Sequence, residues 1–302
     1  MQSRTHMPDP DAPLVETGWL AKRLGDDRLH VIEVGRDANE YERGHIPGAV
    51  AWTCGTDLHT PDRRDALTQR DLTRLLRSSG VRRGGTIVLY GGDDNWFAAH
   101  AYWVLKLRGY DGAKLLDGGR RAWELEDRPM TRSRSLVATT DVNVRGLLTN
   151  RIRAFRDEVV AAAAAHPGGD ELTFLDVRSP EEYRGERLHP EDLPGEVSQV
   201  AGHIPGARNI PWDASTNRDG TYRRAGELRE LYAEAGLTPD RDIVTYCSVG
   251  ERSAHSWFVL HELLGYPNVK NYDGSWTEYG SLVGVPVEVE SMEHSSSSRR
   301  RP

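Results

Sequence analysis

The stretch Gly44-His45-Ile46-Pro47-Gly48-Ala49 occurs twice in this chain, and its second copy, at residues 202–207, is identical. Further matches follow the two copies in the same order. The apolar run at residues 243–246 corresponds to the run at 87–90, and the Asp-Gly pair at Asp273 corresponds to the pair at Asp117. Ordered self-similarity of this kind indicates a tandem duplication. Each copy is a domain of about 130 residues.

Short apolar runs alternate with helical segments in both copies. This alternation predicts an α/β fold with two tandem domains, each a parallel sheet covered by helices. We place the domains at residues 13–135 and 150–290. The segment at residues 131–150 is polar and has few periodic apolar positions, so we expect it to contain the linker.

The composition excludes several classes of protein. The 302-residue chain has a formal net charge of −7, which argues against a basic surface for nucleic acid. No apolar run approaches the roughly 20 residues of a membrane span, and the N-terminus lacks the apolar core of a signal peptide. Two cysteines do not make a disulfide framework. We therefore expect a cytoplasmic protein with neither a nucleic-acid nor a membrane partner.

One cysteine lies where the chain leaves a strand and enters a helix. The apolar run at 243–246 precedes it, and an amphipathic segment at 254–264 follows. Backbone N–H groups and a helix dipole at such a place favour an anion, and therefore the reactive thiolate. A lone cysteine is more often a small buried hydrophobe, but that role needs no polar glycine-containing loop. We interpret Cys247 as a nucleophile within the loop Tyr246-Cys247-Ser248-Val249-Gly250-Glu251-Arg252-Ser253.

These features together resemble the tandem-domain rhodaneses, or sulfurtransferases, over residues 17–288. The resemblance is carried by the doubled domain, DVRSPEEY at 176–183, the two GHIPGA turns and DGSW at 273–276. Residues 246–279, with YCxxGERSxHxWFVL and NYDGSWTEYG, are most similar to bacterial thiosulfate sulfurtransferases. The resemblance implies an active site at the domain interface and an N-terminal domain without its own nucleophile. Consistent with this, no cysteine follows Tyr90.

The resemblance also implies a covalent cycle on Cys247. The thiolate attacks the outer sulfur of thiosulfate, sulfite leaves, and cyanide or a thiol then attacks the persulfide. The expected partners are thus a small-molecule sulfur donor and a thiophilic acceptor, with no metal and no organic cofactor. We expect backbone N–H groups of the loop to stabilise the anionic sulfur. The loop residues besides the nucleophile and Arg252 are Ser248, Val249, Gly250, Glu251 and Ser253.

Two arginines are candidates for binding the substrate. Arg252 follows Cys247 on the same loop and could hold a sulfonate-type group. Its alternative role is to tie the loop to backbone carbonyls or to Glu251. Arg178 follows Asp176 at a strand end that the resemblance places near the pocket. Its alternative role is an internal ion pair with Asp176.

The charge of the loop leaves the sulfur donor open. Close bacterial relatives carry Arg directly after the cysteine, where this chain has Ser248, and Val249 is neutral as well. Glu251 adds a negative charge that offsets Arg252. Thiosulfate is the expected donor, and 3-mercaptopyruvate is the alternative.

The spacing of the loop argues against one other function of the same fold. Phosphatases of the same fold need five residues between cysteine and arginine, whereas Cys247 and Arg252 have four between them. A non-catalytic binding module is a further alternative, and retention of Cys247 speaks against it. Cys54 lacks the context of a nucleophile and is interpreted as a bystander. His45 and His203 recur with the repeated turn, so we expect both to brace it.

Overall fold

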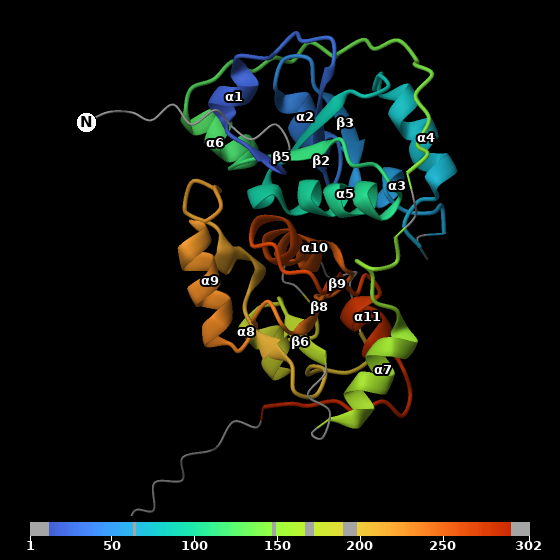
Figure 1. Cartoon of the computed structure of the whole chain (residues 1–302), viewed down its shortest axis with the longest axis vertical. Coiled ribbons are helices and arrows are strands. Elements are labelled where there is room, and N and C mark those ends of the chain that lie inside the picture. Colours follow the sequence, from blue (N-terminus) through green and yellow to red (C-terminus); the bar gives the residue numbers. More distant parts are fainter. Residues whose placement is uncertain (1–11, 63–64, 147–148, 167–171, 190–197, 291–302) are drawn as a thin grey trace, which may run out of the picture.

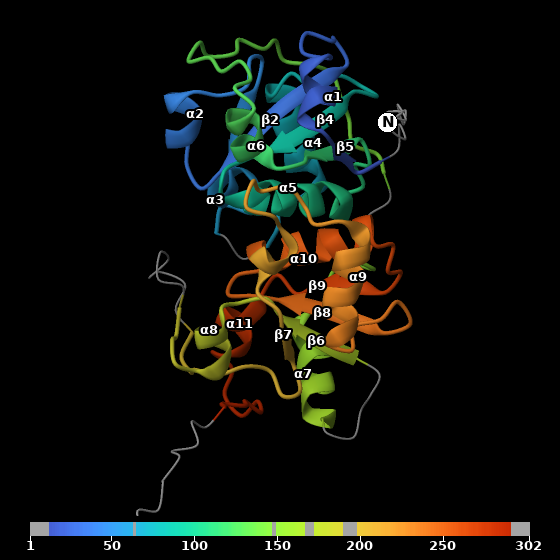
Figure 2. The ribbon, with the colours of Figure 1, turned by 90° about the vertical axis from the view of Figure 1, so that its left-hand side faces the viewer.

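Two parallel sheets organise the chain. The computed structural model describes residues 12–62, 65–146, 149–166, 172–189 and 198–290. Within them every strand pair of both sheets is parallel, which confirms the predicted fold class. Helices cover the faces of each sheet, as Figures 1 and 2 show.

The first sheet has the strand order β1-β5-β4-β2-β3. Its central strands are built from β-branched and leucine side chains that are almost completely buried. Its strands are β1 (Leu14–Val15), β2 (Leu29–Gly35), β3 (Val50–Thr53), β4 (Thr86–Tyr90) and β5 (Ala113–Leu116). The helices of this half are α1 (Thr17–Ala21), α2 (Asn39–Arg43), α3 (Cys54–Asp57), α4 (Gln69–Ser78), η1 (Asp93–Asn95), α5 (Trp96–Leu107) and α6 (Gly119–Leu125).

The second sheet has the order β7-β6-β8-β9. Its strands are β6 (Leu172–Asp176), β7 (Arg208–Asn209), β8 (Asp242–Tyr246) and β9 (Val269–Asn271). The helices of this half are α7 (Arg156–Ala165), α8 (Pro180–Arg184), η2 (Trp212–Ser215), α9 (Ala225–Glu234), α10 (Glu251–Trp257), η3 (Phe258–Leu263) and α11 (Ser275–Tyr279). α10 continues directly into η3, a helical turn of π type.

The repeated turn has the same structure in both halves. The His45 ring stacks on Tyr41 with the ring centres 3.7 Å apart, and His203 stacks on Tyr183 at the same distance. Each histidine Nδ1 also lies within hydrogen-bond distance of the backbone oxygen of its tyrosine, at 2.9 Å and 2.7 Å. The prediction that both histidines brace a turn is confirmed.

The two halves share one hydrophobic core. α5 from the first half and α10 from the second pack against each other between the two sheets. The Tyr102 ring meets Phe258 edge-on at 4.9 Å, and the Tyr102 hydroxyl donates a 2.7 Å hydrogen bond to Glu262. This packing brings the start of α10, and the loop before it, to the border with the first half.

The described residues 131–146 of the predicted linker form neither a helix nor a strand and run along the first half. Arg77 of α4 donates a 2.7 Å hydrogen bond to the backbone oxygen of Val142, and the Val144 amide donates to Thr73. The exact domain limits stay a prediction. Across the described residues, every helix is too short or too polar to cross a lipid bilayer.

Candidate active site

Cys247 is the first residue after β8 and lies four residues before Glu251, the first residue of α10. β8 is an inner strand of its sheet, between β6 and β9. Its carboxyl end therefore lies near the middle of the sheet edge at which parallel α/β folds bind ligands. The buried run that ends at Tyr246 fixes where the loop starts. Cys247 itself is only 1% exposed, and neither cysteine is in a disulfide.

The loop turns back on the Cys247 sulfur. The Gly250 amide donates a hydrogen bond to Sγ at 3.2 Å, and the Ser253 hydroxyl lies 3.7 Å from it. Gly250 adopts a φ of +83°, and a Cβ there would lie 2.3 Å from the Cα of Asp273. Only glycine fits this position, because the left-handed conformation and the close backbone both exclude a side chain.

The DGSW segment, residues 273–276, holds the loop through hydrogen bonds to its backbone. The Cys247 amide donates a 3.0 Å hydrogen bond to the Ser275 hydroxyl, and the Trp276 amide donates to the Cys247 carbonyl at 3.0 Å. The Thr277 amide donates to the Ser248 carbonyl at 2.9 Å. These hydrogen bonds therefore fix the position and orientation of the Cys247 backbone.

Arg252 is held by a carboxylate from α8. Its Nη1 and Nη2 each donate a 2.9 Å hydrogen bond to one oxygen of Glu182, and Nη2 also donates to the Ser248 hydroxyl at 2.7 Å. Burial opposes the charged carboxylate, but the hydrogen bonds and charge of Arg252 outweigh it, so the pKa of Glu182 is lowered. The pair is ionised and tethers the loop to α8.

Sequence reasoning missed Glu182. Its local role was readable, because Ser179 and Glu182 form the reciprocal capping box of α8. The Ser179 hydroxyl accepts from the Glu182 amide, and the Glu182 carboxylate accepts from the Ser179 amide. The second role of Glu182 is the ion pair with Arg252. These two residues are 70 positions apart in the sequence, so no local sequence pattern predicts the pair.

Arg178 forms the internal ion pair that was its alternative role. Its Nε and Nη2 donate to both oxygens of Asp176, and Nη2 also donates to the Gly202 carbonyl at 2.7 Å. The guanidinium lies 4.7 Å from the centre of the Trp276 ring. Arg178 is 1% exposed. A direct contact with substrate stays a prediction.

Glu251 and Val249 differ in their surroundings. Val249 is partly exposed, whereas Glu251 is 5% exposed and is the first residue of α10. The Glu251 carboxylate accepts a hydrogen bond from the Cys54 thiol of the first half, with Sγ and Oε1 3.4 Å apart. Cys54, interpreted from sequence as a bystander, therefore contacts the active-site loop.

Trp96 of the first half also borders the loop, together with Trp212 of the second half. The Arg252 guanidinium lies 5.8 Å from the centre of the Trp96 ring, at the start of α5. Trp96 in turn packs on Trp212, with ring centres 5.6 Å apart. The loop thus lies at the border between the halves, with contacts from both. In the first half, β4 ends at Tyr90 and is followed by Gly91 instead of a cysteine.

The arrangement is a cysteine-centred loop at the carboxyl end of one of two parallel sheets. The rhodanese-like domain family matches the chain twice, at residues 16–126 and 159–282. The chain therefore belongs to the rhodanese family of sulfurtransferases.

Named relatives are similar over almost their whole length. The chain is 49% identical over 276 residues to a protein of Mycolicibacterium smegmatis named "Putative thiosulfate sulfurtransferase", covering 91% of this chain and 97% of the relative. It is 46% identical over 274 residues to "Sulfur carrier protein TtuD" of Thermus thermophilus, covering 91% and 95%.

Solved structures share the fold. The wild-type structure of EanB aligns with a TM-score of 0.79 and 23% identity, covering 93% of this chain and 70% of that one. A complex of the anaerobic ergothioneine biosynthesis enzyme from Chlorobium limicola with trimethyl histidine aligns with the same TM-score and identity, covering 93% and 71%. At this identity the likeness concerns the fold alone.

Proposed function

We propose that the protein moves a sulfane sulfur from thiosulfate to cyanide or a thiol through a persulfide on Cys247. The observation that carries the proposal is the Gly250 amide, which donates a hydrogen bond to Sγ from 3.2 Å. An amide fixed in that place stabilises negative charge on the sulfur, and the adjoining helix dipole adds to it. The names of the relatives support the same donor.

In the first half-reaction the Cys247 thiolate attacks the outer sulfur of thiosulfate. A new S–S bond forms, the S–S bond of thiosulfate breaks, and sulfite leaves with the bonding electron pair. The product is a persulfide whose terminal sulfur carries the negative charge. The Gly250 amide stabilises the sulfur anion before the attack, whereas the Ser253 hydroxyl donates to the Asn271 side-chain oxygen at 2.6 Å.

In the second half-reaction the acceptor attacks the terminal sulfur of the persulfide. Cyanide forms a C–S bond with the terminal sulfur and leaves as thiocyanate, while the S–S bond of the persulfide breaks and its electron pair returns to Cys247 Sγ as the thiolate. A thiol acceptor gives a new persulfide in the same way and loses its proton to solvent. Each half-reaction restores one sulfur anion in the loop, so the proton balance of the protein does not change.

The charge around the loop decides which donor is preferred. Thiosulfate carries two negative charges, and Arg252 is the loop cation that could bind them. Its guanidinium already pairs with Glu182, so a donor must share or displace that carboxylate. Because the pair is neutral and Glu251 lies beside it, 3-mercaptopyruvate, with one carboxylate, is the second candidate donor.

The acceptor is the least constrained part of the proposal. The Thermus relative is named a sulfur carrier protein, which supports onward transfer of the sulfur to an acceptor thiol. A cytoplasmic location and the lack of a nucleic-acid partner stay predictions from the composition.

Steady-state kinetics of thiocyanate formation test the function. A ping-pong cycle predicts parallel double-reciprocal lines when thiosulfate is varied at several cyanide concentrations. Arg252→Gln should raise the thiosulfate KM about tenfold, the effect of one lost charge-assisted hydrogen bond. The matched control is Arg229→Gln, an exposed arginine on α9. Turnover with 3-mercaptopyruvate but not with thiosulfate would identify 3-mercaptopyruvate as the donor. No turnover with either compound would refute the proposed sulfurtransferase activity.

A further inference from the structure

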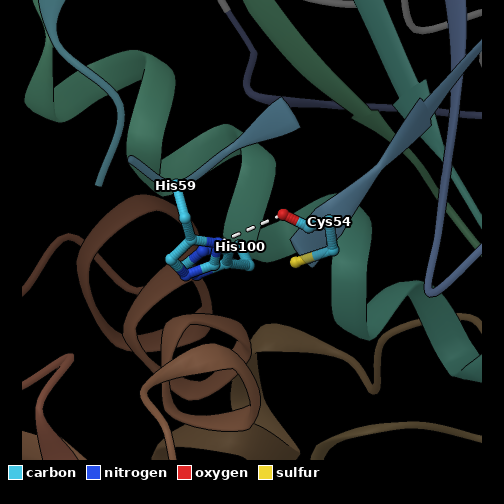
Figure 3. Close-up of side chains that lie close together, drawn as sticks. All are labelled: Cys54, His59 and His100. Atoms are coloured by element: carbon cyan, nitrogen blue, oxygen red, sulfur yellow. Dashed lines mark hydrogen bonds between the residues drawn. The ribbon is translucent and has the colours of Figure 1, made fainter. Parts of the chain in front are cut away.

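Three chelating side chains of the first half lie together beside the active-site loop. They are Cys54 at the start of α3, His59 just after α3, and His100 in the middle of α5. One ligand atom from each lies within 4.8 Å of the other two. Figure 3 shows the two imidazole rings side by side, and their centres are 5.2 Å apart.

His100 has an unusual environment. It is 1% exposed, and among the described residues neither ring nitrogen has a hydrogen-bond partner. Buried polar atoms are rarely left without a hydrogen-bond partner unless a water molecule or an ion satisfies them.

His59 is oriented as metal-bound histidines are. Its Nδ1 lies 3.1 Å from the Cys54 carbonyl oxygen, the dashed line in Figure 3, so Nδ1–H donates and Nε2 keeps the lone pair. A backbone carbonyl on the second nitrogen is the common outer partner of a histidine ligand. His59 is only partly buried, which leaves a path for an ion from solvent.

A fourth donor comes from the other half. The Glu251 carboxylate lies 3.4 Å from Cys54 Sγ and starts α10, four residues after the nucleophile Cys247. One thiolate, two imidazoles and one carboxylate form a donor set of borderline softness. Zn²⁺ prefers this set in tetrahedral geometry, whereas Ca²⁺ and Mg²⁺ prefer oxygen alone.

We propose that Cys54, His59, His100 and Glu251 bind a Zn²⁺-type ion that joins the first half to the active-site loop. The bonds of about 2.0–2.3 Å in such a site place the ligand atoms roughly 3.3–3.8 Å apart. The three ligand atoms of the first half lie at most 4.8 Å apart, so an approach of no more than about 1–1.5 Å, within the reach of side-chain rotation, completes the geometry. This proposal does not depend on the sulfur-transfer chemistry.

Binding would change the charge next to the nucleophile. The Cys54 thiol releases its proton to solvent, and the two negative charges of thiolate and carboxylate then cancel those of the ion. Glu251 would no longer repel an anionic donor approaching the loop. No sequence motif indicates this site, because its four proposed ligands are scattered from residue 54 to residue 251 without a recognised spacing.

Cobalt spectroscopy tests the site directly. Tag-free protein, stripped of metal by a chelator under reducing conditions, is titrated with Co²⁺. We expect about one equivalent to bind, with intense tetrahedral d–d bands and a thiolate-to-cobalt charge-transfer band in the near ultraviolet. Cys54→Ser should abolish the charge-transfer band, and Glu251→Gln and His100→Asn should each weaken binding at least about tenfold.

Three controls keep the outcome decisive. Cys247→Ser should keep the full spectrum, because that thiol lies outside the cluster, and so should His261→Asn, a partly buried histidine also outside it. If a variant folds poorly by circular dichroism, a Zn²⁺-dependent rise in Tm of the wild type, absent in Cys54→Ser, replaces the spectral comparison. Absence of a cobalt band, or a band that is lost in Cys247→Ser, overturns the proposal.

Discussion

Arg252 and Glu182 form a buried, two-point ion pair in which each guanidinium Nη lies 2.9 Å from one carboxylate oxygen. Their exposed fractions are 5% and 2%. The pair fastens the loop after β8 to the helix after β6, so it joins the two central strands of the second sheet at their carboxyl ends. Because both charges are nearly desolvated, removing one partner leaves the other uncompensated.

Glu182→Ala should therefore lower the free energy of unfolding by about 3–5 kcal/mol. The loss should be smaller for Glu182→Gln, which keeps one acceptor for Arg252. Urea denaturation of the variants measures both values. Glu181→Gln is the matched control, because its side chain is 44% exposed on the same helix. A Glu182→Ala variant as stable as the control would show that the pair contributes nothing to the fold.

Gly250→Ala tests the geometry of the sulfur site. A side chain is excluded there by the φ of +83° and by the Asp273 backbone, so the loop must move and withdraw its amide from Sγ. A displacement of about 1 Å costs roughly 100-fold in rate at a catalytic centre, and we expect persulfide formation to slow by that factor.

The control for Gly250→Ala is Gly284→Ala. Gly284 has the same φ of +83°, but no atom lies within 4 Å of the position of its Cβ. Stopped-flow measurement of sulfite release should show a rate within about twofold of wild type, because only the intrinsic backbone penalty remains. Equal slowing in both variants would mean that the amide has no special role at the sulfur.

Asp176 and Arg178 should behave as a structural pair. Arg178→Gln leaves the Asp176 carboxylate, which is 0% exposed, without its cation, so stability should fall by about 3–5 kcal/mol. The double variant Asp176→Asn/Arg178→Gln removes both charges and should recover at least about 2 kcal/mol. The KM for thiosulfate, measured on the folded fraction, should stay within about twofold in the double variant if Arg178 does not touch the substrate. A large rise in KM would support the substrate contact instead.

Asp117 links the halves and makes stability depend on pH. Its carboxylate accepts a 2.9 Å hydrogen bond from the Tyr222 amide, and burial raises the pKa of Asp117 to about 6. The native state therefore holds the proton more tightly than the unfolded chain does. Stability is lost as pH rises from about 4 to above 6, by on the order of 2 kcal/mol after allowance for solvent screening.

Asp117→Asn keeps the acceptor oxygen and removes the charge, so the variant should lose this part of the pH dependence. Urea denaturation at pH 4.5 and pH 7, compared with wild type, measures the difference. Asp111→Asn, whose side chain is 82% exposed, is the control and should titrate as wild type does. Identical pH dependence in wild type and Asp117→Asn would exclude the proposed role of burial.

The internal repeat made most of the fold predictable. The matching apolar runs at residues 87–90 and 243–246 located the strands β4 and β8 inside the two sheets. The short strands β1, β3, β7 and β9 were not predicted, because a run of two to four residues is too short to show a periodic pattern. Their places come from pairing with longer neighbours in the sheet.

The site was predictable only where its chemistry is local. The Cys247 loop could be read from a strand, a glycine and a helix in succession. Glu182 and Cys54 reach that loop from 70 and 197 positions away. The Glu182 contact depends on the pairing of β6 with β8 inside the second sheet, and the Cys54 contact depends on how α5 and α10 pack between the halves.

Persulfide formation on Cys247 is the central claim, and intact-mass spectrometry tests it most directly. The reduced protein is incubated with thiosulfate, separated from the donor and weighed beside Cys247→Ser and Cys54→Ser. We predict one added sulfur atom on wild type and on Cys54→Ser, removed by cyanide, and none on Cys247→Ser. No added sulfur on the wild type, under conditions that load a known rhodanese, or equal addition to Cys247→Ser, would contradict the account.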